Sequence, residues 1–291
     1  AGRTPRGDRS PGEFYQLDME MAFAGQEDVF AVIEAVLPPI FEKFGVYGQT
    51  VSQAPFRRIP FLQAMEDYGS DKPDLRIDLL VHDVTELLSG CGFGPFENGV
   101  VKAVPVSGCG LARKAIDKIV AQVEVQTAQK CYWFKLDEKG EIAGGIAKFI
   151  NAVPGLAQQV AEALKLEPNA LVMLAAGPKL TAQKTAGVAR KLLGAACPEH
   201  MDEKRYELCW IVDFPMFEIG EESGQLEFGH NPFSMPHGGM ESLLKIERAR
   251  RTLWTCGPTS TTWCATASSW PPGRSGTMTR RSWSRPSSWL A

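Results

Sequence analysis

Short strands alternate with amphipathic helices through the middle of the chain, and this alternation constrains the fold more than any other feature. Apolar runs of strand length lie at residues 100–106, 132–137 and 170–177. Apolar residues recur at helical spacing at residues 111–123 and 181–196. The pattern predicts a compact α+β unit, which we bound at residues 77–203.

The segments before this unit predict the first part of a separate domain, residues 8–76. Alternation over residues 13–23 predicts a strand with one face formed by Phe14, Gln16, Asp18 and Glu20. Helical apolar spacing follows at residues 26–44 and 61–68. A turn-rich segment then includes Lys72, which favours a structural role for that lysine.

The segment after the unit predicts the second part of that domain, residues 204–247. Residues 208–217 predict a strand that is buried on both sides around one charged residue, Asp213. A loop rich in glycine, proline and histidine follows at residues 230–239.

Composition places the chain among globular proteins. It has 291 residues, 44% hydrophobic and 22% charged, which suits one large domain or two ordinary ones. A net charge of −3 gives no bulk positive field for nucleic acid, so any RNA contact must be local. The basic helical face of Arg113, Lys114 and Lys118 is typical of a solvated surface. No apolar run is long enough to cross a bilayer and residues 1–8 lack a signal-peptide core, so we expect a cytoplasmic protein without a membrane partner.

Cysteine and histidine spacing indicates neither a disulfide framework nor a metal site. The seven cysteines form no CxxC pair and the four histidines are not spaced as a ligand set. We therefore expect free thiols throughout and no protein-bound metal.

The last part of the chain, residues 248–291, differs from the rest. Residues 251–291 contain no Asp or Glu, five of the seven Trp and sixteen Ser or Thr. No helical or alternating apolar period persists there for long. This tail has too many tryptophans for a low-complexity linker and too many hydroxyls and prolines for a core.

Four ordered segments of the chain resemble the bacterial-type aspartyl-tRNA synthetase family, a class II family. They are DRSPGEFYQLDMEMAF (8–23), YGSDKPDLR (68–76), WIVDFPMFE (210–218) and GHNPFSMPHGGME (229–241). The resemblance covers residues 8–241 and implies an antiparallel class II sheet flanked by helices. It also implies that the middle unit is the α+β insertion called the GAD domain. The anticodon domain and the first class II motif have no counterpart, so we expect the chain to be an internal piece of a longer protein.

The resemblance implies an aspartate–tRNA ligase that uses ATP and Mg²⁺. Its partners would be L-aspartate and tRNA(Asp), possibly with tRNA(Asn) in addition, and the longer protein would be a homodimer. Such chemistry depends on positioning and on neutralising phosphate charge. The sequence leaves open which tRNAs are charged.

The family's binding residues carry over at the positions that match. Ser10 and Phe14 would contact ATP, with the Phe14 ring on the adenine. Gln16 and Asp18 would accept hydrogen bonds from the substrate ammonium group, and His230 would approach the substrate's side-chain carboxylate. Two further acidic residues stay open: Glu20 and Asp213 are either substrate-side carboxylates or structural ones, Asp213 then being a buried carboxylate bonded to backbone donors.

Two parts of the family pattern are missing from the translated residues. Ala1–Pro5 replaces a Phe-Arg-Asp-Glu-Asp stretch, so the arginine that grips the ATP α-phosphate is absent. The tail lacks the family's later Glu and Arg. If high-GC codons are chosen for residues 262–290, a shifted reading frame is compatible with a family-like string that contains VELASGAVRNH. We therefore expect a frameshifted tail and an inactive chain.

Two alternatives to a ligase remain. A non-catalytic adaptor with a GAD domain would bind tRNA, but EFYQLD and HNPFSMP would have no reason to flank that domain in an adaptor. A pseudoenzyme that binds only aspartate would need a folded tail.

Overall fold

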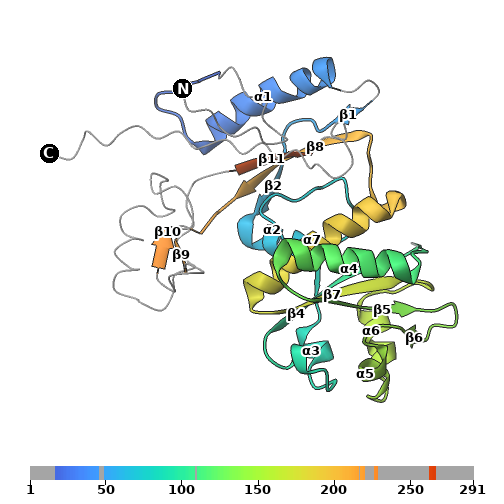
Figure 1. The fold of residues 1–291 in the computed structure, drawn as a ribbon. Helices are drawn as coiled ribbons and strands as arrows, with labels where there is room; N and C mark the ends of the chain where they lie inside the picture. The colour runs from blue at the N-terminus through green and yellow to red at the C-terminus, as the bar shows by residue number, and fades with distance from the viewer. Residues whose placement is uncertain are drawn as a thin grey trace.

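The computed structural model describes residues 17–45, 49–108 and 110–215, together with the short strands 217–219, 226–228 and 262–266. Two larger sheets organise these residues, and each has helices on both faces (Figure 1). The α+β class predicted from the sequence is confirmed.

One long strand, β8 (Arg205–Val212), is the centre of the first sheet. β1 (Thr50–Val51) and β2 (Arg57–Pro60) pair with it in parallel, and β11 (Thr262–Thr266) pairs with it antiparallel. The predicted antiparallel sheet is therefore mixed in its described part. The parallel pairs arise because the whole second unit separates β2 from β8, which gives the chain the long crossover that parallel strands need.

β8 is buried on both faces because a helix packs against each of them. Leu208, Trp210 and Val212 lie in one apolar cluster with α1 (Gln26–Phe44). The alternate residues Cys209 and Ile211 lie in another with α2 (Phe61–Tyr68). The two-residue side-chain period of a strand thus divides β8 between two helices.

A buried carboxylate attaches α1 to this sheet. The Trp210 ring stacks on Phe30 with centroids 4.2 Å apart. The Trp210 indole Nε1 donates to Glu34 Oε1 at 2.7 Å, and the Phe56 backbone N–H donates to the same oxygen at 3.1 Å. Glu34 is only 7% exposed, so it satisfies two donors that water cannot reach.

Removing this acceptor should destabilise the chain. We expect Glu34→Ala to lower the free energy of unfolding by about 1–3 kcal/mol, because two buried donors lose their partner. Glu34→Gln keeps a side-chain oxygen and should cost less. The exposed Glu42 of the same helix gives the control, Glu42→Ala. Urea unfolding followed by far-UV circular dichroism measures all three, and equal losses in the two alanine variants would contradict the assignment.

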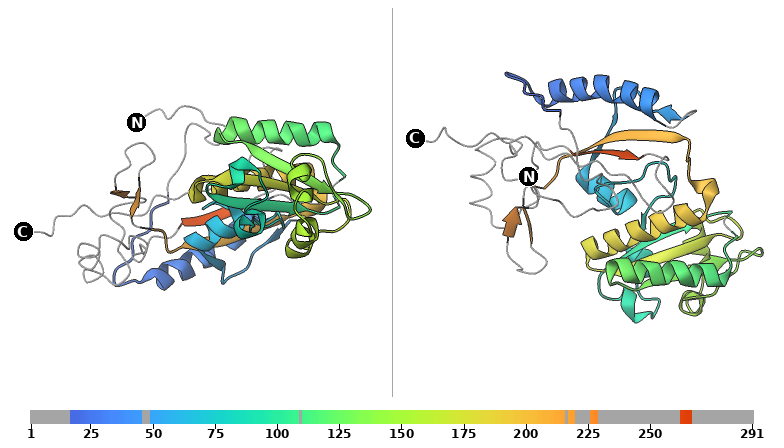
Figure 2. Two further views of the ribbon diagram at one scale, coloured as in Figure 1. Left: turned by 90° about the horizontal axis from the view of Figure 1, so that it is seen from below. Right: turned by 45° about the horizontal axis from the view of Figure 1, so that its top comes forward.

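The second sheet is antiparallel throughout and has the order β3-β4-β7-β5-β6. Its strands are β3 (His82–Asp83), β4 (Val100–Val106), β7 (Leu171–Gly177), β5 (Cys131–Leu136) and β6 (Ile142–Ala143). Helices α4 (Arg113–Thr127) and α7 (Lys179–Ala196) cover one face, and the other is covered by α3 (Thr85–Leu88), α5 (Ala147–Asn151) and α6 (Leu156–Ala163), as the rotated views show (Figure 2).

The remaining described elements are short. Two 3₁₀ turns lie at Gly94–Phe96 and Pro198–His200. β9 (Phe217–Ile219) and β10 (Leu226–Phe228) pair antiparallel. No helix among the described residues is long and apolar enough to cross a membrane.

Alternating burial along the central strands explains why this unit was predictable. Val101 and Ala103 of β4 belong to one apolar cluster, whereas Val104 and Val106 belong to the cluster on the opposite face. The predicted strands over 100–106, 132–137 and 170–177 and the predicted helices over 26–44 and 61–68 are confirmed within one residue at each end. The helices predicted over 111–123 and 181–196 begin or end two to four residues away from the prediction.

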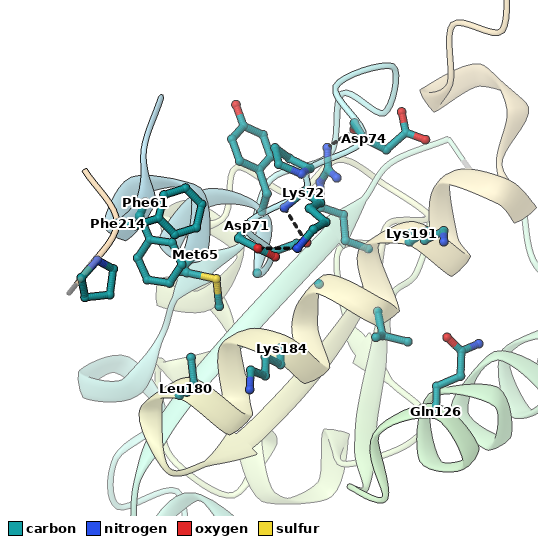
Figure 3. A pocket seen from close by; sticks show the side chains of 18 residues that line it. Phe61, Met65, Asp71, Lys72, Asp74, Gln126, Leu180, Lys184, Lys191 and Phe214 are labelled. Carbon is teal, nitrogen blue, oxygen red and sulfur yellow. Dashed lines mark hydrogen bonds and ion pairs between the residues drawn. The ribbon is translucent and has the colours of Figure 1, made fainter. Parts of the chain in front are cut away.

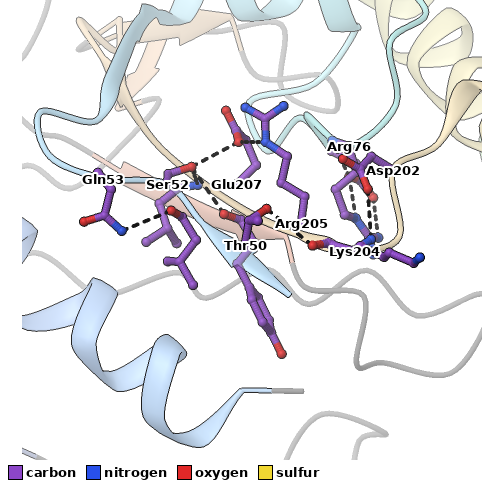
Figure 4. Close-up of polar contacts among 12 residues, drawn as sticks. Thr50, Ser52, Gln53, Arg76, Asp202, Lys204, Arg205 and Glu207 are labelled. Carbon is purple, nitrogen blue, oxygen red and sulfur yellow. Dashed lines mark hydrogen bonds and ion pairs between the residues drawn. The ribbon is translucent and has the colours of Figure 1, made fainter. Parts of the chain in front are cut away.

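The chain enters and leaves this second unit at one place. Ile77 and Met201 form an antiparallel bridge, and the Asp202 backbone N–H donates to the Arg76 carbonyl at 2.9 Å. Just beyond, the Thr50 N–H donates to the Lys204 carbonyl at 2.9 Å, where β1 begins its pairing with β8 (Figure 4). The two ends of the unit are therefore hydrogen-bonded to each other and to the first sheet.

Two predicted strands are wrong in part. The predicted strand over 13–23 is not a strand in its described residues, 17–23, where Leu17 and Phe23 are exposed. An alternating segment becomes a strand only when a neighbouring strand satisfies its backbone groups. The strand predicted over 208–217 ends at Val212, because Asp213 has a positive φ of 57° and turns the chain.

The tail contains a strand, β11, although its side-chain pattern has no persistent period; backbone pairing with β8 does not require one. Cys197 is disulfide-bonded, so the expectation of free thiols throughout is wrong. The described cysteines Cys91, Cys131 and Cys209 are free.

Candidate functional site

The described part of the structure contains three of the site residues expected from the sequence. Asp18 and Glu20 are exposed and precede α1, outside any strand. Asp213 is exposed at the end of β8, so it is not the buried carboxylate that one interpretation required. None of the three lines the cavity described next. Ser10, Phe14, Gln16 and His230 lie outside the described residues.

A cavity of about 560 Å³ lies where the two units meet (Figure 3). One wall is α2 with the loop 69–74 that follows it, and the opposite wall is α7. Phe214 and Pro215, just after β8, close one end, and Gln126 of α4 lies at the other. Segments far apart in the sequence therefore form one site.

Arg190 of α7 fixes the chain segment that crosses between the units. Its Nε donates to the Leu79 carbonyl at 2.6 Å, and its Nη2 donates to the carbonyls of Ile77 at 2.6 Å and Asp74 at 3.0 Å. The guanidinium lies 4.9 Å from the centre of the Tyr68 ring. Burial lowers the pKa of Arg190 to about 10, so the group stays charged at neutral pH.

Two glycines allow α2 and α7 to approach closely beside this arginine. Gly69 ends α2 with φ of 64°, in the left-handed region that favours glycine. A Cβ on Gly69 would overlap the Gln183 carbonyl and the Gly187 backbone, and a Cβ on Gly187 would overlap the Gly69 carbonyl. The backbones therefore pack directly against each other.

The crossing segment 74–79 should become less stable when the Arg190 guanidinium, which donates to its carbonyls, is removed. We expect Arg190→Met to lower the free energy of unfolding by about 2–4 kcal/mol, because buried carbonyls are left without donors. The neighbouring exposed residue gives the control Lys191→Met. Denaturant unfolding gives the energy, and limited proteolysis reports cleavage within 74–79. Unchanged protection of that segment in Arg190→Met would contradict the role.

A buried lysine joins the same helices to the second sheet. Lys102 of β4 is fully buried, and its Nζ donates to a Glu66 carboxylate oxygen and to Asp83 Oδ2, the latter at 2.9 Å. The Gln183 amide also donates to Glu66, and Lys179 Nζ lies 3.6 Å from it. Burial raises the pKa of Glu66, but the nearby lysines and hydrogen bonds outweigh it, so the pKa is lowered overall. Two carboxylates thus compensate the buried ammonium group.

His200 forms a third polar connection, at the exit from the second unit. Its Nδ1 lies 2.8 Å from Asp78 Oδ1, and its Nε2 lies 2.7 Å from the Ser107 carbonyl. Both partners are acceptors, so only the doubly protonated imidazolium donates to both. Burial lowers the pKa of His200, but the Ser107 carbonyl and Asp78 outweigh it, so the pKa is raised overall.

This histidine should make stability depend on pH above the ordinary histidine pKa of about 6.5. A raised folded-state pKa means that the contribution is complete below the unfolded-state value and is lost as pH rises through the folded-state value. We therefore expect the melting temperature to fall over that range, and His200→Gln to abolish that part of the fall. The control is His82→Gln. Burial lowers the pKa of His82, which is the opposite direction to the shift of His200. An NMR titration of His200 below 6.5 would contradict the prediction.

Sequence reasoning missed most residues of this junction. Lys102 gave a signal, since it is the only charge in the strand-like run VVKAVPV. Arg190 and Gln183 gave none, because a polar residue on an amphipathic helix is ordinarily solvated. Lys72, predicted to be a turn residue, lies in the loop 69–74, where its Nζ pairs with Asp71 at 2.5 Å.

No group of three potential metal-ligating side chains occurs among the described residues. We therefore assign no residue of this part of the chain to a metal ion.

Comparison with known proteins identifies the family. Residues 4–253 match the family described as tRNA synthetases class II (D, K and N). The chain is 44% identical over 242 residues to the aspartate–tRNA ligase of Streptomyces coelicolor, and 47% identical over 244 residues to the aspartate–tRNA(Asp/Asn) ligase of Acidiphilium cryptum. A third relative, the aspartate–tRNA(Asp/Asn) ligase of Zymomonas mobilis, is 46% identical.

These alignments cover 82% of the chain but only 40% of each relative. The match lies on both sides of the second unit as well as within it. The chain therefore belongs to the class II tRNA synthetases of the aspartate, lysine and asparagine group.

Proposed function

We propose that this chain is the central part of an aspartate–tRNA ligase. The observation that carries the proposal is the 44–47% identity to proteins named as aspartate ligases. A GAD-containing adaptor would show similarity confined to residues 77–203, whereas the family match runs from residue 4 to residue 253.

The proposed reaction has two steps. A carboxylate oxygen of L-aspartate attacks the α-phosphorus of ATP, and the bond to pyrophosphate breaks, which gives aspartyl-adenylate. A ribose hydroxyl at the 3′ end of tRNA then attacks the activated carbonyl and AMP leaves. The tRNA is tRNA(Asp), and the names of two relatives add tRNA(Asn) as a second substrate class.

Residues near the start of the chain would hold the substrates together with His230. Asp18 is exposed, so it is accessible to a substrate ammonium group. Gln16 would act with it, Phe14 and Ser10 would contact ATP, and His230 would donate to the substrate's side-chain carboxylate. Glu20 and Asp213 are two further candidate carboxylates, both exposed. Mg²⁺ would arrive with ATP, and no group of three potential metal ligands occurs among the described residues.

The second unit, residues 77–203, would be the GAD-like insertion between catalytic segments 8–76 and 204–247. The Ile77–Met201 bridge supports these boundaries, because it closes the unit where the chain enters and leaves it. The complete ligase would be a cytoplasmic homodimer.

The chain as it stands would be inactive. Ala1–Pro5 replaces the stretch that carries the arginine for the ATP α-phosphate, and residues 248–291 would be a frameshifted tail without the later Glu. Each lost contact to developing charge costs on the order of 10²-fold to 10³-fold in rate.

Aspartate-dependent exchange of pyrophosphate into ATP tests both parts of the proposal. We expect background exchange from the 291-residue chain. A ligase with the family's sequence restored before Asp8 and after Arg248 should exchange, and Asp18→Ala in that protein should reduce the rate about 10²-fold. Exchange by the chain itself would contradict its inactivity. A restored protein that fails with aspartate, yet is folded, would contradict the ligase assignment.

A further inference from the structure

The sequence contains a single Asn-Gly pair, Asn98–Gly99, and it lies in an exposed loop before β4. The loop follows the 3₁₀ turn Gly94–Phe96 and stops at Val100, where β4 begins. Both residues of the pair are exposed. The proposed aspartylation uses neither of them, so any chemistry at this pair is independent of that function.

No hydrogen bond protects the groups of this pair that can react. Among the described residues, neither the Asn98 side-chain amide nor the Gly99 backbone N–H takes part in a hydrogen bond. The N–H of Glu97 donates to the Gly94 carbonyl at 3.2 Å, and the ladder between β4 and β7 begins only at Val100. The peptide unit that joins the pair therefore lies between two hydrogen-bonded segments and belongs to neither. Backbone motion is least hindered where such bonds are missing, so this unit can rotate.

Packing requires glycine at the second position of the pair. Gly99 has φ of 135°, in the region that favours glycine, and a Cβ there would lie 2.4 Å from the Gly177 carbonyl oxygen. A larger residue would shield the N–H sterically, but the end of β7 leaves no space for one. The fold thus keeps beside Asn98 the residue that least hinders an attack on its side chain.

The two other described asparagines lack this combination of features. Asn169 is exposed, but the next residue is the fully buried Ala170, whose N–H donates to the Glu167 carbonyl at 3.0 Å. Asn151 ends α5, and its Nδ2 donates to the Ile142 carbonyl at 2.8 Å. One therefore lacks a free attacking N–H and the other lacks a free side-chain amide, so both serve as internal references.

We propose that Asn98 is a site of spontaneous deamidation in the folded chain. The Gly99 nitrogen attacks the Asn98 side-chain carbonyl carbon and gives up its proton to the solvent, and the bond from that carbon to Nδ2 breaks. The Nδ2 group takes a proton from the solvent and leaves as ammonia, which leaves a succinimide ring. Water then opens the ring at either carbonyl and gives aspartate or isoaspartate. No electron is transferred and water is the only co-reactant, so the reaction needs nothing beyond the chemical lability of asparagine.

Isoaspartate would change the start of β4. It adds a carbon to the main chain directly before the strand and places a carboxylate beside the exposed Glu97. Val101 of β4 donates its N–H to Thr85 Oγ1 at 2.9 Å, and its carbonyl accepts from the Val84 N–H at 2.9 Å. These bonds join β4 to the start of α3, so we expect them to weaken first.

The test compares the folded 291-residue chain with a synthetic peptide of residues 94–102, both kept in mildly alkaline buffer. Mass spectrometry after proteolysis detects the exchange of NH₂ for OH, and protein isoaspartyl methyltransferase with labelled S-adenosylmethionine measures isoaspartate. We expect Asn98 in the folded chain to react within about 10-fold of the peptide rate, a difference in barrier below about 1.4 kcal/mol. Asn151 and Asn169 should stay intact over the same period.

Asn98→Gln is the matched control. It keeps the amide but lengthens the side chain by a methylene, so the ring that forms would be larger and less favourable. We expect no isoaspartate in residues 94–102 of this variant. Its melting temperature should not change, because the replaced side chain is exposed and has no hydrogen bond to a described residue.

Two outcomes would overturn the proposal. One is a rate at Asn98 more than about 10-fold below the peptide rate, since the fold would then protect the pair. The other is equal deamidation at Asn169, since the free N–H of Gly99 would then be irrelevant. Hydrogen exchange of the Val101 amide tests the consequence for β4: it should be faster in the deamidated chain than in fresh chain, and equal exchange would contradict the effect on the strand.

Discussion

The guanidinium of Arg190 is the constraint on which the junction of the two units depends. The crossing segment 74–79 has no helix or strand beyond the single bridge at Ile77. Three of its backbone carbonyls accept hydrogen bonds from Arg190. An arginine suits this task because its planar fork donates in several directions at once and keeps its charge when buried.

The contacts around Arg190 are polar and closely packed, which restricts how the units can meet. The glycine contact between α2 and α7 admits no larger side chain, and Lys102 requires both Glu66 and Asp83 to compensate its charge. A buried ammonium group without partners would cost several kcal/mol, so alternative arrangements that separate these groups are disfavoured. An apolar interface of equal area would tolerate sliding more easily. The arrangement thus favours one orientation of α2 on the second unit.

Elements that are periodic and clearly bounded were predictable from the sequence. Helix α2 was predicted residue by residue because the pattern of Phe61–Tyr68 ends at Gly69, a left-handed C-cap. Strand β8 was predicted too long because alternation does not reveal that Asp213 adopts a positive φ. The segment 17–23 was predicted as a strand because its pattern alternates, yet a pattern cannot show whether a neighbouring strand is present.

The candidate site was harder to predict than the fold, for a physical reason. A binding residue carried over from a family motif is local in sequence, as Asp18 is. The junction cavity depends on pairings more than a hundred residues apart, such as that of Arg190 with Leu79. Among the charged residues of the junction, only Lys102 stands alone in an apolar strand, a pattern that indicates a buried charge. The disulfide of Cys197 likewise depends on a spatial neighbour and not on cysteine spacing.

The tail shows that a segment can pair in a sheet without carrying the side chains that a reaction needs. Strand β11 pairs with β8 over Thr262–Thr266 through main-chain groups, which every residue except proline carries in full. Pairing beside β8 therefore places little demand on side-chain identity. Charge is different: residues 251–291 contain arginines but no Asp or Glu, so their side chains supply no carboxylate to a substrate in any conformation. A segment can thus complete part of the sheet around β8 and still lack a group that the proposed reaction requires.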